Sequence, residues 1–153
     1  MREKINSFSG EYAFLSNFYP AVIQWSGILY PTNEHAFQAA KSLDLQTRRK
    51  IAQAGTPGLA KRAGRLVSLR EDWEDEKIYI MTDIVHAKFL QHGHLRNLLI
   101  GTGDAFLEEG NTWGDRTWGT VNGVGRNLLG IILMEVRRSV QDIGIGEIQE
   151  SSL

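Results

Sequence analysis

The hydrophobic pattern divides the chain into a short N-terminal part with strand-like segments and a longer part dominated by helices. The spacing of apolar residues predicts a helix over 127–140, whose buried side carries Leu128, Ile131, Ile132 and Val136. Residues 70–91 have the length and the apolar recurrence of a longer helix. Shorter helices are predicted over 33–43, 47–54, 57–62 and 94–100.

Cap and turn residues mark where several of these elements begin. Pro31-Thr32-Asn33 offers a helix cap, and Thr56-Pro57 supplies a cap together with a proline at the first helical position. Ser26-Gly27 separates the apolar segments 22–25 and 28–30, a pattern that predicts a β-hairpin.

The sum of these elements predicts an α+β fold that is mostly helical, with short N-terminal strands. One more strand is predicted over 105–108, followed by a glycine- and tryptophan-rich loop over 111–125. The chain has no repeat, low-complexity tract or flexible linker, so we expect a single compact domain over 1–143. Residues 144–153 are predicted to form a flexible tail.

Composition narrows the classes of protein that this chain can be. Its 153 residues include 42% hydrophobic and 23% charged residues, which is ordinary for a folded domain. The 17 basic and 18 acidic side chains give a formal net charge of −1, whereas proteins built to grip nucleic-acid phosphates usually carry a basic excess. The absence of cysteine excludes disulfides and thiolate chemistry. With neither a signal segment nor a membrane span, a cytoplasmic protein is expected.

The first segment that suggests chemistry is the predicted helix that begins near Asn33. Glu34, Gln38 and Lys41 follow one another at spacings of four and three, so they share one narrow polar row. Alanine, phenylalanine and leucine cover most of the remaining surface, which indicates a largely buried helix. A buried carboxylate or ammonium group is costly unless it is paired or used. The alternative is a solvated helix face with a weak Glu–Lys pair.

The second segment is the loop over 108–119, which holds two tryptophans and two glycines within seven residues. Tryptophan offers a flat surface on which a base or a sugar can stack, and glycine allows a backbone to approach a ligand closely. Glu109 and Asp115 could bind ribose hydroxyls or stabilise a positive charge. The alternative is a structural loop in which the tryptophans fill a core and the glycines only turn the chain.

Three further features of the sequence carry weaker indications of chemistry. The glycine turn over 122–125 leads into the last helix, where free amides favour an anion, although an ordinary turn and cap explain it equally well. Lys61 to Arg65 is basic, and a solvated helix end accounts for it. The four histidines lack a metal-ligand spacing, so neither a metal nor another cofactor is expected.

Taken together, the segments resemble the NADAR (YbiA-like) family, whose motifs occur in the same order. The resemblance extends from about Phe8 to Arg138. The matching segments are Phe14-Leu15-Ser16-Asn17-Phe18-Tyr19-Pro20, Thr32 to Lys41, Ala60 to Arg65, Asp72-Trp73, Ala87-Lys88-Phe89, Glu109-Gly110-Asn111, Asp115, Trp118-Gly119, Gly125-Arg126-Asn127 and Gly130 to Met134.

This resemblance implies an N-glycosidase that hydrolyses the bond between a ribose phosphate or ADP-ribose and a nitrogenous base. Two substrate groups are implied, namely intermediates of riboflavin synthesis and ADP-ribosylated guanine in nucleic acid. It also leaves open ADP-ribosylated DNA as a substrate and a toxin as a partner of the chain in an antitoxin role. The expected catalytic residues are Glu34, Lys41 and Asp115. The expected substrate-binding residues are Asn17, Phe18, Arg65, Trp73, Glu109, Trp118 and Asn127.

Cleavage of a C1′–N bond develops positive charge on the ribose, which a carboxylate can stabilise while it activates water. Either Glu34 or Asp115 suits this role. Lys41 could bind phosphate, protonate the leaving base, or form a Schiff base with C1′. Two alternatives remain open, a non-catalytic module that binds ADP-ribose or another nucleotide and a structural domain with tryptophans in its core.

Overall fold

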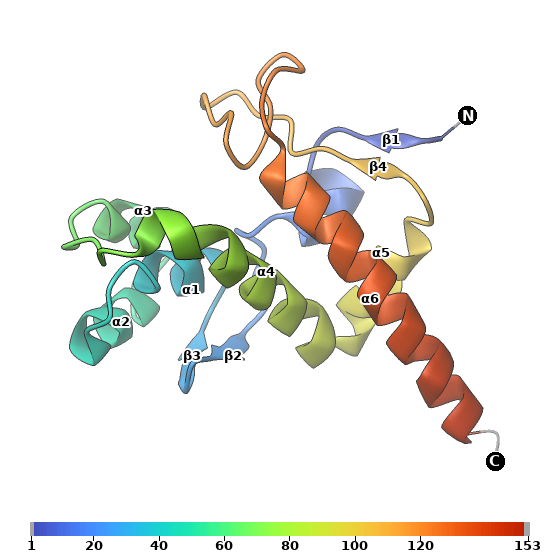
Figure 1. Ribbon diagram of the computed structural model, residues 1–153, viewed down its shortest axis with the longest axis horizontal. Coiled ribbons are helices and arrows are strands. Elements are labelled where there is room, and N and C mark those ends of the chain that lie inside the picture. The colour runs from blue at the N-terminus through green and yellow to red at the C-terminus, as the bar shows by residue number, and fades with distance from the viewer. Residues whose placement is uncertain (1, 152–153) are drawn as a thin grey trace. The chain divides into compact units, whose positions relative to one another are not determined.

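The computed structural model describes residues 2–151, and it describes side chains over 2–143. Eleven elements follow one another along these residues (Figure 1). The chain forms two compact units. Unit 1 contains Met1–Leu15 and His92–Leu153, and unit 2 contains Ser16–Gln91.

Unit 2 opens with the predicted β-hairpin. Strand β2 (Ile23–Trp25) pairs antiparallel with β3 (Ile28–Tyr30), and Ile23 lies opposite Tyr30. Ser26 and Gly27 have φ angles of 51° and 82°, the left-handed conformation that a tight two-residue hairpin turn requires at both positions. The hairpin prediction is therefore confirmed.

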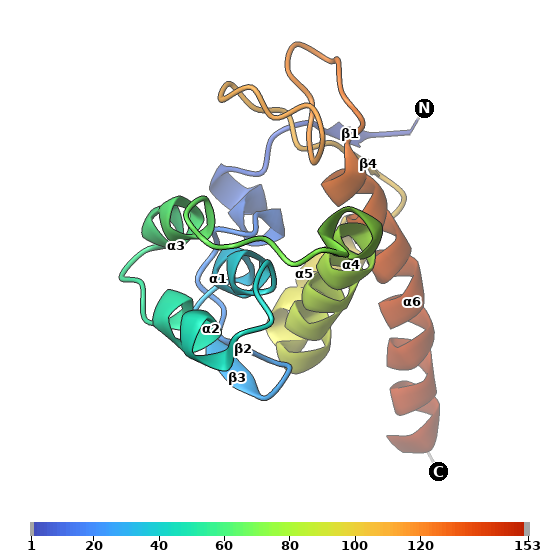
Figure 2. The ribbon, with the colours of Figure 1, turned by 60° about the vertical axis from the view of Figure 1, so that its left-hand side comes forward.

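Four helices complete unit 2, and α1 lies between the other three (Figure 2). Thr32 and Thr56 cap α1 and α3 as predicted, because each hydroxyl accepts a hydrogen bond from a backbone amide three residues later. Asp44 caps α2 in the same way. The four helices are α1 (Asn33–Ala39), α2 (Leu45–Ala52), α3 (Pro57–Gly64) and α4 (Trp73–Gln91).

Two of these helices are shorter than predicted. Helix α1 ends at Ala39 rather than near residue 43, because the next amides, of Lys41 and Ser42, bond three residues back and tighten the chain. Helix α4 begins at Trp73 rather than at Arg70. The Asp72 carbonyl accepts the first helical amides, while its carboxylate receives two bonds from Arg70.

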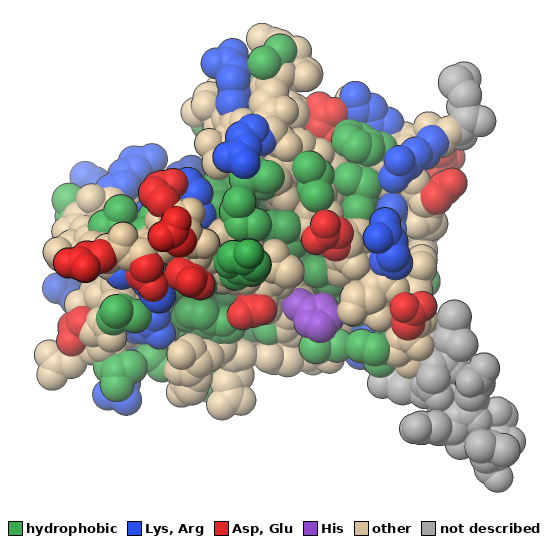
Figure 3. All heavy atoms as spheres, viewed as in Figure 1, with side chains coloured by type: hydrophobic (Ala, Val, Ile, Leu, Met, Phe, Trp, Pro, Cys, Tyr) green, Lys and Arg blue, Asp and Glu red, His purple; other side chains and the backbone are tan. Residues whose placement is uncertain are grey.

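Acidic side chains gather at the start of helix α4 and basic ones at the end of helix α3. Glu74, Asp75 and Glu76 occupy the first turn of α4, where their negative charges interact favourably with the positive end of the helix dipole. Lys61 and Arg62 occupy the last turn of α3. Figure 3 shows acidic side chains gathered over the start of α4, with basic ones along the adjoining edge.

Unit 1 joins both ends of the chain. Strand β1 (Lys4–Ile5) pairs in parallel with β4 (Phe106–Leu107), a pairing absent from the sequence-based prediction. Helix α6 (Leu128–Ser151) packs on α5 (Gly93–Gly101) and on β4. A 3-10 helix over Gly10–Leu15 follows β1 and was also not predicted.

The α+β class, mostly helical with short strands, is confirmed. The closing helix begins at Leu128 and extends beyond the predicted end at residue 140. Ile132 and Val136 are buried as predicted, whereas Ile131 is 42% exposed and the prediction of its burial is wrong. The predicted tail over 144–153 lies outside the described side chains, and the domain boundary at residue 143 stays a prediction. Among the described residues, no helix combines the length and apolar character needed to cross a membrane.

Candidate active site

The polar row on α1 is buried in unit 2. Glu34 and Gln38 expose only 7% and 4% of their surface, so the solvated-face interpretation is wrong. The Gln38 side-chain amide donates a 2.7 Å hydrogen bond to Glu34 Oε1. The i, i+4 spacing thus orients the carboxylate within the helix, as the sequence indicated.

Lys41 lies one turn beyond this pair and is half-buried. Burial lowers the pKa of its ammonium group, and the nearby charges of Arg65 and Lys61 lower it further, while Glu34 raises it. One carboxylate and three cations therefore act on one another at the junction of α1 and α3. Such a cluster can hold an anionic group beside Glu34.

Gly64 allows α3 to lie directly against this row. A methyl group built at Gly64 would overlap the side-chain amide oxygen of Gln38, the residue that bonds Glu34. The residue pattern alone suggested a solvated helix end for residues 61–65, and the family resemblance added Arg65 as a substrate-binding residue. The structure instead shows that Gly64 is buried and supports the orientation of the carboxylate.

The loop before the hairpin packs on the start of α1. The Asn17 carbonyl oxygen accepts a 3.0 Å bond from the Glu34 amide, and the Asn17 side-chain oxygen accepts one from Asn33. Phe18 is 42% exposed, with Lys61 Nζ 6.0 Å from its ring centroid. Phe18 is therefore open to a ligand, whereas the Asn17 side chain is engaged within the protein.

Lys88 is a residue that sequence reasoning passed over, although it lay within a matched motif. It is 1% exposed, its Nζ donates a 3.0 Å bond to the Ser16 carbonyl, and it lies over the ring of Tyr19. Burial lowers its pKa to about 7. Lys88 thereby holds the loop whose next residue, Asn17, bonds the Glu34 amide. A lysine within a helix gave no local signal of this burial.

Trp73 is placed in the core rather than on an open surface. It is 5% exposed, and its ring packs against Phe37 with centroids 5.1 Å apart. The Arg70 amide, just before Trp73, donates to the Lys41 carbonyl and ties this segment to the end of α1. This environment favours a supporting role, and direct substrate contact by Trp73 stays a prediction.

The remaining candidates lie in unit 1, on the loop between β4 and α6. Asp115 Oδ1 accepts hydrogen bonds from the amides of Thr117 and Trp118, each 2.9 Å long. The Asn111 side chain in turn bonds both backbone polar groups of Asp115. One oxygen of this carboxylate is therefore used to shape the loop. Its predicted catalytic role is untested.

Asn127 joins this loop to strand β4. Its side-chain oxygen accepts from the Glu109 amide, and its side-chain nitrogen donates to the Leu107 carbonyl. These contacts favour a structural role for Asn127, while substrate binding by Asn127 and Glu109 stays a prediction.

The backbone amides of Asn127, Leu128 and Leu129, at the start of α6, are not free to bind a phosphate. The amides of Leu128 and Leu129 donate to the carbonyl oxygens of Thr117 and Trp118. The Asn127 amide donates to Gly119. The helix-start interpretation is therefore wrong for these amides.

The tryptophans of the loop do not share one environment. Trp113 is 62% exposed, which rules out a core-filling role for this ring, whereas Trp118 is partly buried. Stacking of a ligand on Trp118 remains a prediction.

His35 belongs to the scaffold of unit 2. Its two ring nitrogens lie 2.8 Å from the Thr32 hydroxyl and 2.9 Å from the Ala54 carbonyl oxygen. Over the part of the chain that the structure describes, no group of three or more His, Asp or Glu side chains is arranged to hold a metal ion.

The sequence-family model of the NADAR domain matches residues 5–141 of the chain. The chain belongs to the NADAR domain family.

Two relatives cover most of this NADAR chain. N-glycosidase YbiA of Shigella flexneri serotype 5b (strain 8401) is 43% identical over 137 residues, which are 88% of this chain and 85% of the relative. N-glycosidase Npun_R5314 of Nostoc punctiforme is 38% identical over 138 residues, 86% of this chain and 88% of its own. These relatives confirm the prediction of a hydrolase that acts on N-glycosyl bonds.

Another relative carries the name of a metabolic pathway, and a solved structure has the same fold. The riboflavin biosynthesis protein VVA0006 of Vibrio vulnificus is 40% identical over 134 residues, 86% of this chain but 36% of that protein. The NMR structure of the Escherichia coli protein YbiA matches with a TM-score of 0.82 and 38% identity, over 95% of this chain and 89% of that one. The YbiA-like fold is therefore confirmed.

Proposed function

We propose that this NADAR chain hydrolyses the N-glycosidic bond of a small phosphoribosylated base, an intermediate of riboflavin synthesis. The observation that carries this proposal is the buried Glu34 carboxylate, oriented by Gln38 next to the cations Lys41, Lys61 and Arg65. A carboxylate beside an anion-binding cluster suits a sugar that develops positive charge and carries a phosphate.

Glu34 has the properties that the central step needs. Its burial reduces solvent screening, so its charge acts more strongly on a ribose ring that becomes positive at C1′. The Gln38 bond to Oε1 limits rotation of the carboxylate, which keeps it in place before the reaction begins.

The bond changes balance as a simple hydrolysis. The C1′–N bond breaks and its electron pair leaves with the base nitrogen, while a water oxygen forms the new bond to C1′. Glu34 accepts the proton released by the water, and Lys41 supplies a proton to the departing base. The lowered pKa of Lys41 makes its ammonium group a better proton donor than an ordinary lysine.

The cations on α3 suit the phosphate of the substrate. Arg65 is exposed and Lys61 half-buried, and both are close enough to Lys41 to lower its pKa. Phe18, beneath Lys61, offers an exposed ring on which the base or sugar can rest. The net charge of −1 favours a small metabolite over a long nucleic acid.

The test compares two substrates with the wild-type protein and the Glu34→Gln variant. One substrate is the phosphoribosylated aminopyrimidine and the other an oligonucleotide with ADP-ribosylated guanine, and mass spectrometry follows release of base or sugar. We expect Glu34-dependent release from the aminopyrimidine. Faster release from the oligonucleotide would overturn the substrate assignment while retaining the glycosidase.

A folded protein that binds either substrate without release would overturn the catalytic proposal. It would favour the nucleotide-binding module instead. Thermal unfolding of both proteins provides the folding control, because Glu34→Gln retains the oxygen that Gln38 bonds.

A further inference from the structure

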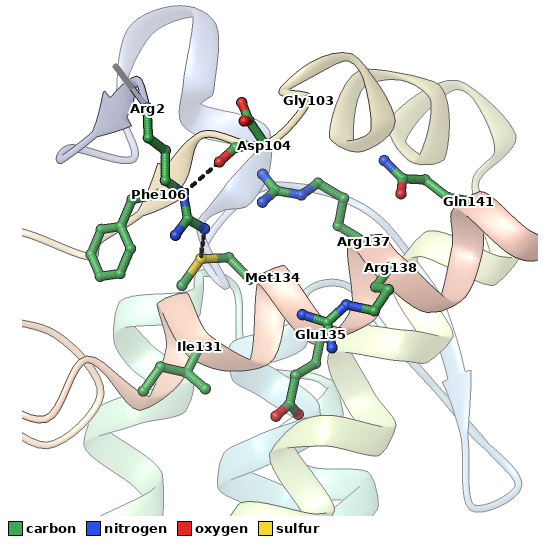
Figure 4. Close-up of a pocket in the computed structure, with 10 residues that line it drawn as sticks. All are labelled: Arg2, Gly103, Asp104, Phe106, Ile131, Met134, Glu135, Arg137, Arg138 and Gln141. Atoms are coloured by element: carbon green, nitrogen blue, oxygen red, sulfur yellow. Dashed lines mark hydrogen bonds between the residues drawn. The ribbon is translucent and has the colours of Figure 1, made fainter.

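Unit 1 contains a cavity of about 450 Å³ that involves none of the residues assigned to hydrolysis. One side of α6, the start of the chain and the segment before β4 form its walls (Figure 4). Three arginines line it, namely Arg2, Arg137 and Arg138.

Arg137 is the buried cation of this cavity. It is 6% exposed, and its Nη1 donates a 2.9 Å bond to the Thr102 hydroxyl. Burial lowers its pKa, and the charges of Arg2 and Arg138 lower it further against an opposing effect of Asp104. No carboxylate among the described side chains lies within ion-pair distance of this guanidinium.

Arg2 is held in place by neutral groups. Its Nε donates a 2.6 Å bond to the Asp104 carbonyl oxygen, its Nη2 lies 3.4 Å from Met134 Sδ, and its guanidinium lies over the Phe106 ring. Figure 4 marks the two hydrogen bonds of Arg2 and shows the Arg2 and Arg137 guanidinium groups on the same side of α6. The acidic side chains of Asp104 and Glu135 also line the cavity, yet neither forms an ion pair with Arg2 or Arg138.

A buried guanidinium without a counter-charge is costly, and two more arginines nearby increase the cost. A bound oxyanion removes this cost, because guanidinium groups bond a phosphate through paired N–H donors. The cavity is larger than a phosphate ion, and Phe106, Ile131 and Met134 add an apolar part to its lining.

We propose that this cavity is a second ligand site, which binds a phosphate monoester of nucleotide size. The phosphate lies between Arg2 and Arg137, with Arg138 at the rim. The attached group covers the exposed part of Ile131 and Met134. This site is independent of the proposed hydrolysis and uses no residue of the α1 row.

The test uses the whole chain labelled with ¹⁵N, titrated with inorganic phosphate, adenosine 5′-monophosphate and adenosine. We expect the amide signals of Gly103 and Arg137 to shift saturably with phosphate, with a dissociation constant on the order of 1 mM. Adenosine 5′-monophosphate should bind more tightly, and adenosine alone should leave these signals unchanged. Absence of a shift with both phosphate-bearing probes would overturn the proposal.

Single variants test whether the phosphate binds in this cavity or on another basic surface of the protein. Arg2→Gln should weaken binding by roughly tenfold, because it removes one charge-assisted contact. Arg138→Gln should weaken binding by less, because this guanidinium lies at the rim. Arg96→Gln, an arginine of α5 outside the cavity, is the matched control and should bind as the wild type. Equal weakening in all three variants, or shifts confined to signals of Glu34 and Lys41, would show that the cavity is not the site.

Discussion

The α1 row of unit 2 and the loop between β4 and α6 in unit 1 use similar polar residues in different ways. In the row, the helix and the Asn17 carbonyl satisfy the backbone, so the Glu34 carboxylate bonds the side chain of Gln38 and acts on the charge of Lys41. In the loop, the backbone has no regular pairing, and Asp115 bonds two of its amides. A helix leaves side chains available for chemistry, whereas an irregular loop requires them for its own shape.

The largest expected effect comes from making the same carboxylate-to-amide change in both regions. Glu34→Gln should lower kcat by about 10²- to 10⁴-fold, because it removes the charge that stabilises the transition state. Asp115→Asn retains the oxygen that accepts the loop amides and should lower kcat by less than about tenfold. Steady-state kinetics on the cleaved substrate measures both. Equal losses would mean that the loop carboxylate also takes part in the chemistry.

Lys88 provides a test of the support beneath the α1 row. Its pKa falls from 10.5 when the chain is unfolded to about 7 when it is folded. Between these values the unfolded chain binds more protons, so this group makes the unfolding free energy rise with pH, by up to about 1.4 kcal/mol per pH unit. Below pH 7 and above pH 10.5, Lys88 does not make the unfolding free energy depend on pH.

Lys88→Met should remove this rise, which urea unfolding at several pH values between 7 and 10 measures. The comparison uses the slope with pH, because loss of the bond to the Ser16 carbonyl changes absolute stability as well. Parallel curves for the two proteins would show that Lys88 does not titrate in this window.

Lys41 distinguishes an electrostatic role from a covalent one. Lys41→Met should lower kcat/KM by about 10- to 100-fold, and Lys41→Arg should recover only the part of this loss that comes from the positive charge, because arginine retains the charge but does not donate its proton. Borohydride reduction during turnover, followed by mass spectrometry, is the complementary measurement. An enzyme–sugar adduct at Lys41, with an inactive Lys41→Arg variant, would instead establish the Schiff-base route.

Gly64→Ala should have the smallest effect of the four. The added methyl group displaces Gln38 and costs about 1–3 kcal/mol of stability through overpacking. Because Gln38 orients Glu34, kcat should fall by a few-fold, roughly the effect of losing one hydrogen bond. Gly58→Ala in the same helix is the matched control, since its methyl group would meet only ordinary contacts. Equal kcat values in both variants would show that the packing of α3 at Gly64 does not affect the orientation of Glu34.

Local features of the fold follow from the amino-acid sequence alone. Thr32, Thr56 and Pro57 mark helix starts because a cap depends on residues only a few positions apart. Ser26-Gly27 marks the hairpin for the same reason. The shared face of Glu34, Gln38 and Lys41 follows from helical periodicity, and the ordered motifs indicated the NADAR family.

Features that join distant segments of the chain depend on its tertiary fold. The β1–β4 pair links Lys4 to Phe106, and no local pattern specifies such a partner. The burial of Lys88, the packing of Gly64 on Gln38 and the meeting of Arg2 with Arg137 depend likewise on which surfaces come together. Spacing along the chain determines which side chains share a face, whereas burial and charge depend on what covers that face.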